Sequence, residues 1–557
     1  MRRIAVILMM LVMLCDAADM QARRRRSKSR KPARTSAPAP KPKAPSVAEI
    51  PVAEETMLMP KHEMRGAWLA SVYGIDWPSR QGTGADVAAA QRLELCRILD
   101  VLQKAGINAV LLQVRSMSDA FYPSSLEPWS RFLTGTRGEA PAEGWDPLEV
   151  AVSEAHARGM ELHAWVNPFR LAGGPSPEAA PVARGKGTFD PVARGWVLTW
   201  RKPGNASAVS VLDPGNPEAR KHIVEVCREI VSRYDVDGLV FDDYFYPDAL
   251  PLGKGYDFAE YQRYVKHHKG SEPLSQADWR RDNVARTVAD VHAMLEKGAP
   301  WVRFGISPAG VAGGNGASAV KYGLRVPQGS DWMYDRIFCD PLQWLAEGTV
   351  DYVSPQLYWT SLHATNPYEP LASWWGDVAV RFGRHVWPSQ SVGTIPEGEA
   401  AWAEQGFEVG INRRCADAAD AGSIFYSTAH LTGKKMKGLG DYLATHCYRA
   451  PALMPPMRWK EAPNPGSLSH LELSDGVLCW ESLGERMRYV VYAVPETVEM
   501  LDALSGTDRN FSPEYIAGIS YTNSFVLPAP LRKGYRYAVA PYDRYGNEWD
   551  ASILTEN

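Results

Sequence analysis

The sequence lacks several features that would place it in a specialised class of protein. It has only 7 cysteines among 557 residues, and none forms a CxxC pair, so neither a disulfide framework nor a structural zinc site is predicted. Beyond residue 14, no apolar run reaches the length of about 18 residues that a membrane-spanning helix needs, which excludes a polytopic membrane protein. The net charge of −3 provides no basic field, so we expect no nucleic-acid partner.

The composition is that of a globular protein with ample material for a core. Hydrophobic residues make up 45% of the chain and charged residues 22%, which excludes wholesale disorder, collagen and a coiled coil. Aromatic residues are plentiful, with 19 Trp and 24 Tyr. Such residues fill ordinary cores, and they also bind flat apolar faces such as those of sugar rings. At about 100–200 residues per domain the chain holds three to five domains, or two if one is a large barrel.

The first residues predict an export signal. Two arginines follow Met1, and an apolar run then covers 4–14, which is the length of a secretory h-region. We predict a signal peptide over residues 1–18 and a location in the cell envelope. The end of the run resembles a lipobox that would make Cys15 a lipid anchor, and ordinary cleavage after Ala17 or Ala18 is the alternative.

A linker is predicted over residues 19–60. It starts with four arginines at 23–26 and continues through alternating Ala and Pro at 37–42, a composition typical of an extended tether. A basic tether of this kind could also lie on an anionic envelope surface.

Regular alternation of strand and helix patterns begins after residue 62. Short apolar runs rich in β-forming residues occur eight times, at 66–71, 109–114, 161–166, 238–242, 302–306, 352–358, 386–391 and 423–427. Helical patterns separate them, at 86–104, 147–158, 217–234, 283–297, 341–347, 370–382 and 400–421. Eight such repeats predict an α/β fold, a (β/α)₈ TIM barrel over residues 62–450. A doubly wound open sheet is disfavoured because no glycine-rich phosphate turn follows the first strand, and we expect no cofactor.

The C-terminal residues, 455–557, have a different pattern. Short strand-like runs appear at 468–473, 476–481, 489–494, 524–527 and 535–541, without helical periodicity. This pattern predicts a β-sandwich. Trp480 and the runs at 489–494 and 535–540 resemble a fibronectin type III module.

Polar side chains gather at the predicted carboxyl ends of successive strands, where a barrel places its active site. The candidate substrate-binding residues are Gln113, Arg115, Asp119, His163, Trp165, Asn167, Tyr244, Ser307, Gln356, Tyr358 and Trp359. Amides and carboxylates pair with hydroxyl groups, and aromatic faces stack on pyranose rings, so the set suits a polyhydroxylated ligand. His163 could instead be a satisfied core histidine, and Trp165 and Trp359 could be packing residues.

The strongest single signal is the pair Asp242 and Asp243, which ends a buried apolar strand. Burying two acids is costly unless the charges are used or paired. Glycoside hydrolysis needs two carboxyl groups, so we predict Asp242 as the acid and Asp243 as its partner, with Asp119 and Asp340 as other candidates for the second group. A structural salt bridge to Arg115 or Arg170 is the alternative, and no glutamate stands at a strand end.

Several motifs together resemble the glycosyl hydrolase-like family 10, also called the family of unknown function 187. They include Glu-Met-Arg-Gly-Ala-Trp-Leu at 63–69, Gln-Val-Arg at 113–115, His-Ala-Trp-Val-Asn-Pro at 163–168, Gly-Ile-Ser-Pro at 305–308 and Asp-Tyr-Val-Ser-Pro-Gln-Leu-Tyr-Trp at 351–359. The resemblance implies a glycosidase barrel in which the Asp242–Asp243 pair, Gln356 and Tyr358 belong to the site. One bacterial branch of the family resembles a hydrolase specific for denuded peptidoglycan, an envelope lipoprotein.

The function predicted from the sequence is therefore an exported glycoside hydrolase that cleaves bacterial cell-wall glycan, without a metal. A non-catalytic carbohydrate-binding barrel and a glycosidase on another polysaccharide are the rivals. A metal-dependent deacetylase is less favoured, because His163 and Asp242 have no clustered third ligand.

Overall fold

The computed structural model describes residues 59–555 except 173–188, 206, 243–244, 271, 315, 330–331, 396–397, 417–419, 500–502 and 504–509. The predicted signal peptide, Cys15 and nearly all of the predicted linker lie outside the described residues. Within the described residues, no helix is both long enough and apolar enough to cross a membrane.

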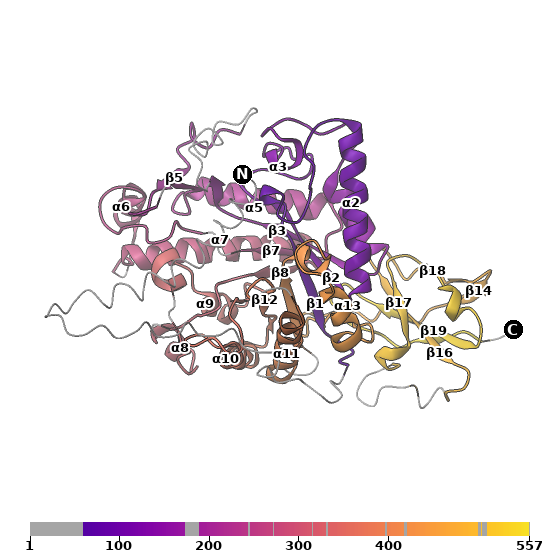
Figure 1. Cartoon of the computed structure of the whole chain (residues 1–557). Helices are drawn as coiled ribbons and strands as arrows, with labels where there is room; N and C mark the ends of the chain where they lie inside the picture. The colour runs from indigo at the N-terminus through magenta and orange to yellow at the C-terminus, as the bar shows by residue number, and fades with distance from the viewer. Residues whose placement is uncertain are drawn as a thin grey trace, which may run out of the picture.

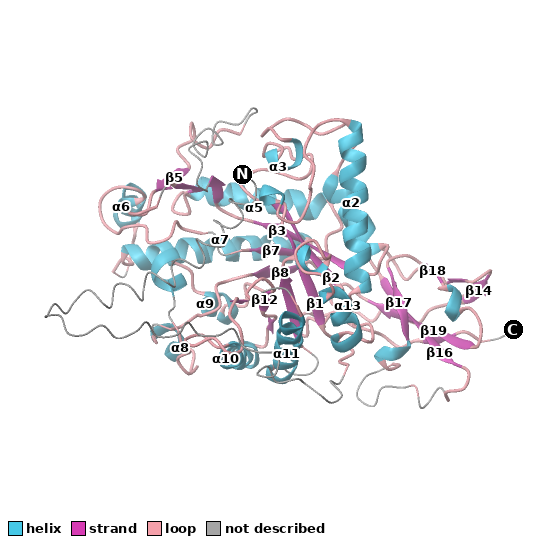
Figure 2. Cartoon of the chain, viewed as in Figure 1, coloured by secondary structure: helices cyan, strands magenta, loops and turns pink. Residues whose placement is uncertain are grey.

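A parallel sheet lies at the centre of the molecule, with helices packed around it (Figures 1 and 2). Its strands in chain order are β1 (Met64–Leu69), β2 (Ala109–Arg115), β3 (Glu161–Val166), β7 (Gly238–Phe241), β8 (Arg303–Ile306), β9 (Tyr352–Val353), β10 (Gln356–Leu357), β11 (His385–Val386), β12 (Ser389–Ser391) and β13 (Gly422–Tyr426). Each predicted barrel strand corresponds to one or two of them.

The sheet curls round so that its two ends meet. The ladder runs β10-β12-β13-β1-β2-β3-β7-β8-β9-β11, with β10 and β11 at its ends. The chain itself joins these ends, because β10 directly follows β9 and β12 directly follows β11 in the sequence. Pro355 and Pro388 divide the sixth and seventh predicted strands, because a proline has no N–H to give to the ladder. The fold is therefore TIM-barrel-like, as the alternation predicted.

Helices follow the strands in the order the sequence predicts. The helices at the predicted positions are α2 (Ala85–Lys104), α4 (Pro147–His156), α5 (Pro217–Arg233), α7 (Gln276–Gly298), α9 (Pro341–Ala346), α10 (Tyr368–Phe382) and α11 (Glu399–Cys415), and α6 (Phe258–His267) was not predicted. Three of them begin with a capping side chain followed by proline at the first helical position: Asp146, Asn216 and Asp340 each accept backbone N–H bonds there.

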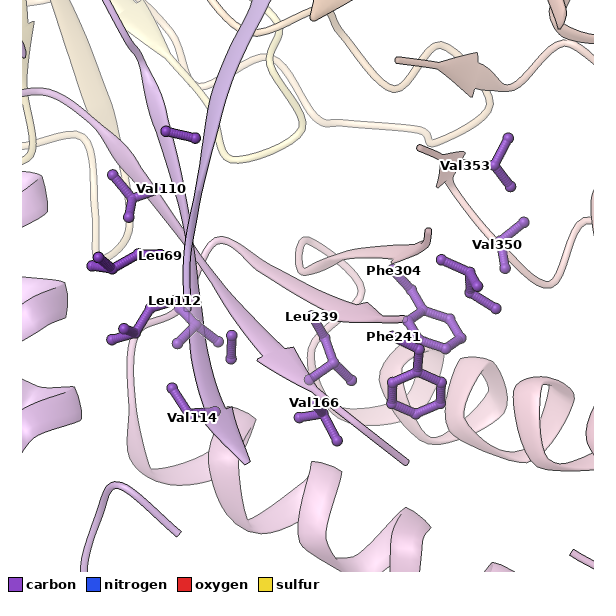
Figure 3. Close-up of a cluster of buried hydrophobic side chains, with 14 of the residues drawn as sticks. Leu69, Val110, Leu112, Val114, Val166, Leu239, Phe241, Phe304, Val350 and Val353 are labelled. Atoms are coloured by element: carbon purple, nitrogen blue, oxygen red, sulfur yellow. The ribbon is translucent and has the colours of Figure 1, made fainter. Parts of the chain in front are cut away.

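Alternation along the strands divides the barrel core into two layers. Outward-facing side chains, including Leu112, Leu239 and Phe304, pack between the sheet and the helices (Figure 3). Inward-facing side chains, including Trp68, Trp165 and Trp387, form a separate cluster inside the barrel. A residue's position in this alternation therefore decides whether its side chain can reach the mouth of the barrel.

Inward-facing glycines make room for large rings. A Cβ on Gly238 would lie 2.5 Å from the His163 ring, and one on Gly305 would lie 2.1 Å from the ring of Tyr352. Small residues on one strand thus leave room for large side chains on the neighbouring strand inside the barrel.

A small antiparallel sheet that the sequence analysis did not predict follows the third barrel strand. It consists of β4 (Arg170–Ala172), β5 (Val197–Trp200) and β6 (Val209–Leu212), in the order β4-β6-β5. Its strands have only three or four residues, too few for a clear period-2 pattern.

The C-terminal part forms two antiparallel sheets that share a core. One contains β14 (Glu472–Ser474), β15 (Val477–Cys479) and β18 (Ser524–Val526), and the other β16 (Arg488–Pro495), β17 (Ile516–Ser520), β19 (Tyr535–Tyr542) and β20 (Ser552–Ile553). Leu478 and Val491, from different sheets, belong to the same buried cluster. The strands β17 and β20 were not predicted, and assignment to the fibronectin type III class stays a prediction.

The C-terminal part closes the barrel at the amino ends of the strands. Arg488 of β16 pairs with Glu161, the first residue of β3, at 2.6 Å, and both side chains are buried. Arg544 pairs with Asp237, which directly precedes β7, at 3.0 Å, and the Tyr521 ring stacks on His156 at 3.8 Å. We call this contact region, made of Glu161, Asp237, Arg488 and Arg544, the barrel floor. It joins the two parts through buried charges.

Candidate active site at the carboxyl ends of the strands

Asp242 lies at the inner side of the barrel where β7 ends. Val240, two residues earlier, belongs to the inward-facing cluster, so the alternation directs Asp242 inward as well. Its side chain is 4% exposed. The carboxylate accepts hydrogen bonds from Trp165 Nε1 at 3.4 Å and from Asn167 Nδ2. Two residues predicted to share a site with Asp242 thus contact it directly.

A chain of amide side chains continues from Asp242 across three strands. Asn167 Oδ1 accepts from Gln113 Nε2 at 2.8 Å. Gln113 Oε1 in turn accepts from the backbone N–H groups of Ser71 at 3.1 Å and Val72 at 2.9 Å. Because the Asn167 oxygen is engaged by Gln113, its nitrogen points to Asp242. Gln113 and Asn167 therefore orient the carboxyl group as well as lying beside it.

Arg115 does not face a ligand, in contrast to the sequence prediction. Its guanidinium is fully buried and pairs with Glu127 at 2.6 Å, while Nη1 donates to the carbonyl oxygens of Asn167 and of Pro168 (2.9 Å to the latter). Glu127 also contacts His222 Nε2 at 2.9 Å. Arg115 thus holds the backbone at the end of β3, where Asn167 sits. It is also not the salt-bridge partner of Asp242.

Glu127 was not predicted as part of the site, since nothing in its loop sequence marks it. Burial opposes its ionisation, but the charge of Arg115 and hydrogen bonds from His222 and Arg115 outweigh this and lower its pKa to about 2. The group therefore stays ionised in the folded protein at ordinary pH and balances the buried guanidinium.

We expect Glu127→Gln to destabilise the protein by about 3–5 kcal/mol at pH 7, because it leaves the Arg115 charge buried without a counter-charge. The wild-type advantage is present above the ordinary glutamate pKa and disappears as pH falls towards 2. Urea denaturation at pH 7 and at pH 3 measures both effects. Glu139→Gln, an exposed position in the same loop, is the control. Equal stability of Glu127→Gln and wild type at pH 7 would contradict the assignment.

Asp119 and His163 have structural partners that keep them from the mouth. Asp119 is buried, and its Oδ1 accepts from the backbone N–H groups of Ser116 at 3.0 Å and Met117 at 2.8 Å, so it shapes its own turn. His163 is fully buried inside the barrel, with Nδ1 2.9 Å from the Tyr352 hydroxyl and Nε2 3.1 Å from Glu161. The core-histidine alternative holds for His163, and neither residue is a ligand contact.

The fifth and sixth strands contribute hydroxyl, amide and aromatic groups. Ser307 Oγ donates to the Ser354 carbonyl at 2.8 Å, and Gln356 Nε2 donates to the Ser307 carbonyl at 3.1 Å. Ser307 is buried and serves to join the strands, whereas Gln356 is half-buried. These contacts fix the start of the segment that carries Tyr358 and Trp359.

Aromatic rings line the described mouth on the side of the sixth and eighth strands. Tyr358 stacks against Tyr426 of β13, with ring centres 5.6 Å apart and an interplanar angle of 25°, and both rings are half-buried. Trp359 is also half-buried and lies against Gly310, where a Cβ would approach its ring to 2.6 Å. Tyr426 was not among the predicted ligand contacts, although its position at a strand end marked it as part of the mouth.

The second carboxyl group stays a prediction. Asp243 and Tyr244 lie outside the described residues. Asp340 caps α9, accepting from the N–H groups of Leu342 at 3.2 Å and Gln343 at 3.3 Å, which gives its carboxylate a structural role at the start of that helix. Asp119 is excluded by its own turn. Among the described residues, no cluster of three or more His, Cys, Asp or Glu side chains could hold a metal ion.

The model of the family described as "Glycosyl hydrolase-like 10" matches residues 63–404, from β1 to the first turns of α11. The chain belongs to this family. It is therefore a glycoside hydrolase with an α/β TIM-barrel-like fold, and the inward carboxyl group at residue 242 lies in the matched region.

Two relatives show the same family relation. The glycosyl hydrolase YngK of Bacillus subtilis (strain 168) is 36% identical over 409 residues, which cover 71% of this chain and 74% of the relative. The glycosyl hydrolase DigH of Escherichia coli (strain K12) is 37% identical over 328 residues, covering 57% and 70%. The glycoside hydrolase domain of PgaB (BpsB) from Bordetella bronchiseptica is similar in structure with a TM-score of 0.43, at 14% identity, over 69% of this chain and 99% of that domain.

Proposed function

We propose that this protein cleaves bacterial cell-wall glycan, with peptidoglycan strands that lack stem peptides as the substrate. The observation that carries the proposal is the inward-facing Asp242 carboxyl group, held by Trp165 and Asn167 at the strand ends that also carry an aromatic pair suited to a sugar ring. The choice of glycan rests on the resemblance of the strand-end motifs to the peptidoglycan-specific branch of the family.

In this proposal Asp242 is the general acid that protonates the glycosidic oxygen as the bond to it breaks. The indole and the amide that donate to it hold the carboxyl group in place for that proton transfer, and its burial keeps it out of bulk water. Asp243 supplies the second carboxylate, either to activate water or to attack the sugar. Gln113 and Asn167 keep the acid in one orientation while the substrate binds.

The stacked rings of Tyr358 and Tyr426 form the sugar-binding face of the proposed site. We expect Tyr358→Ala to raise KM about tenfold with kcat changed less than twofold, since a lost aromatic contact is worth about 0.5–1.5 kcal/mol. Initial rates of reducing-end release against glycan concentration measure both constants. Tyr358→Phe retains the ring and should restore KM. An unchanged KM in Tyr358→Ala would remove this residue from the site.

We also propose that the protein acts in the cell envelope. The arginines after Met1 and the apolar run at 4–14 support export, and Cys15 is the proposed lipid attachment site. The basic residues at 23–26 suit a tether near an anionic surface. We expect cells fed radiolabelled fatty acid to incorporate the label into the wild-type protein and not into Cys15→Ser. If both proteins are exported in soluble form without the label, cleavage after Ala17 or Ala18 is favoured instead.

The substrate proposal is tested by comparing peptidoglycan before and after complete amidase treatment. We expect soluble oligosaccharides from the amidase-treated glycan and none from the untreated sacculus, with the products identified by mass spectrometry. Matched reactions with chitin and a capsular polysaccharide distinguish a cell-wall enzyme from a glycosidase on another polymer. Release from the capsular polysaccharide alone would replace the proposed substrate.

A further inference from the structure

Two buried acids lie behind the aromatic side of the mouth, on a helix that the proposed mechanism does not use. Glu404 and Glu408 are one turn apart on α11 and are 1% and 2% exposed. Neither forms an ion pair with a Lys or Arg side chain in the described ranges. Two acids one turn apart on a helix usually face solvent. Burying them costs free energy unless groups from other parts of the chain donate hydrogen bonds to them.

Glu404 holds the chain just beyond the sugar-binding tyrosine. Its Oε1 accepts from the backbone N–H of Ser361 at 2.5 Å, and its Oε2 accepts from Ser361 Oγ at 2.9 Å. Ser361 follows Tyr358 by three residues and Trp359 by two. These two hydrogen bonds hold the Glu404 carboxylate in one orientation and hold Ser361 against it. Glu404 therefore anchors the aromatic segment to α11.

Glu408 makes the corresponding contact to the seventh barrel strand. Its Oε2 accepts from Gln390 Nε2 of β12 at 2.8 Å and from Gln405 Nε2 at 3.2 Å. Glu404 precedes it by one turn on α11, and neither acid pairs with a described Lys or Arg side chain, so two ionised carboxylates here would have no counter-charge. The pair therefore connects the end of the seventh strand to the loop after the sixth.

The surroundings decide which group is protonated. Burial, and then the charge of Glu404, raise the pKa of Glu408 well above its ordinary value, while the amides of Gln390 and Gln405 only partly offset them. Tyr368 faces the pair from α10 and Ser361 from the loop, and Tyr442 and Cys447 pack against Gly406 between the two acids. None of these groups carries a positive charge that could balance a second carboxylate, which favours the protonated form of Glu408.

We propose that Glu404 and Glu408 are positioning residues for the sugar-binding segment 358–361, acting as a carboxyl–carboxylate pair that shares one proton. The effect on sugar binding rests on the proposed function of Tyr358. The proton-sharing itself does not, because it follows from burial and from the contacts of α11.

A rise in pH should break this arrangement. The folded protein keeps the Glu408 proton above the pH at which an unfolded glutamate loses it. The stabilisation by the neutral form is therefore complete at acid pH and is lost as pH rises towards the elevated pKa. Two negative charges would then repel each other with no cation between them. This repulsion would weaken the hydrogen bonds that hold Glu404 to Ser361.

The first experiment is thermal unfolding of the full chain between pH 5 and pH 9, which needs no substrate. Glu408→Gln keeps an amide donor for Glu404 and removes the titration. We expect its Tm to fall less with rising pH than that of the wild type, so that its advantage over the wild type is largest at pH 9. Glu399→Gln, exposed on the same helix, should follow the wild type. If the Tm of Glu408→Gln and the Tm of the wild type change by the same amount between pH 5 and pH 9, the proposed proton-sharing is wrong.

The second experiment separates binding from chemistry with Ser361→Ala, a small change that preserves the fold. We expect KM for the glycan to rise about five- to tenfold at pH 6, with kcat within twofold, and Ser361→Thr to restore KM by keeping the hydroxyl. Glu408→Gln should flatten the rise of KM towards pH 9. An unchanged KM in Ser361→Ala would overturn the positioning role. If the chosen glycan is not cleaved by the wild type, the proposed substrate fails, and the unfolding experiment still decides the shared proton.

Discussion

Asp242→Asn should lower kcat by about 10²–10⁴-fold while changing KM less than threefold. An asparagine has nearly the same shape and can still accept from Asn167, but it has no proton of suitable acidity to give to the leaving oxygen. Reducing-end release from amidase-treated peptidoglycan measures the rate, and glycan binding by calorimetry measures retention of the site.

The matched control is Asp441→Asn, since Asp441 is exposed and pairs with Lys104 at the surface. Its kcat should equal that of the wild type. The thermal unfolding curves of both variants should overlay that of the wild type, so that a lost rate in Asp242→Asn is a loss of chemistry. Full activity in Asp242→Asn would show that Asp242 is not the general acid, and Asp243 would then be the next candidate for that role.

Arg488→Met should destabilise the protein by about 3–5 kcal/mol at pH 7, the second large effect that the structure leads us to expect. The guanidinium is buried at the barrel floor, 2.6 Å from Glu161, and its removal leaves a carboxylate with only the more distant Arg303, at 3.7 Å, and His163. Urea denaturation followed by tryptophan fluorescence measures the loss.

The pH dependence of this loss has a definite sign. Burial opposes ionisation of Glu161, but Arg488, the hydrogen bond from His163 and the charge of Arg303 lower its pKa to about 2. The folded protein thus releases a proton that the unfolded chain still holds near pH 4. The stabilisation is present above the ordinary glutamate pKa and is lost as pH falls towards 2. Arg488→Met should therefore resemble the wild type most closely near pH 2.

Two further variants make the result specific to the buried pair. Arg486→Met removes a half-exposed arginine of the same C-terminal part, which pairs with Asp235 at 3.8 Å, and should cost less than about 1 kcal/mol. The double variant Arg488→Met with Glu161→Gln should recover at least half of the loss, because no uncompensated charge remains. A single variant as stable as the wild type would show that the C-terminal part does not depend on this contact.

These contacts also change the interpretation of the C-terminal part. The sequence predicted only a β-sandwich that resembles a fibronectin type III module, yet Arg488 and Arg544 reach the amino ends of β3 and β7. A module fixed through buried charges cannot rotate freely against the barrel. Nothing in the local pattern of 488 or 544 distinguishes a floor contact from a solvated arginine, because the partner residues are more than 300 positions away.

Much of the barrel could be predicted from the sequence because its signals are local. Apolar runs of strand length, capping residues before proline, and glycines after helices each depend on a few neighbouring residues. The same holds for Asp242, since a buried strand that ends in an acid is visible without knowing what surrounds it. The prediction of Trp165, Asn167 and Gln113 beside it followed from the geometry common to all parallel barrels.

The roles of individual polar residues were decided by the tertiary structure. Arg115 and His163 had the chemistry of ligand contacts, and Glu127 and Glu161 take up their polar groups instead. Glu404 and Glu408 had the spacing of surface acids and became buried partners of Ser361 and Gln390. The sequence by itself determined which residues can carry charge and where the strands end. Whether a charge is buried, paired or free to act depends on side chains brought close by the fold, since the energy of an ionised group is set by its solvent and its nearest partners.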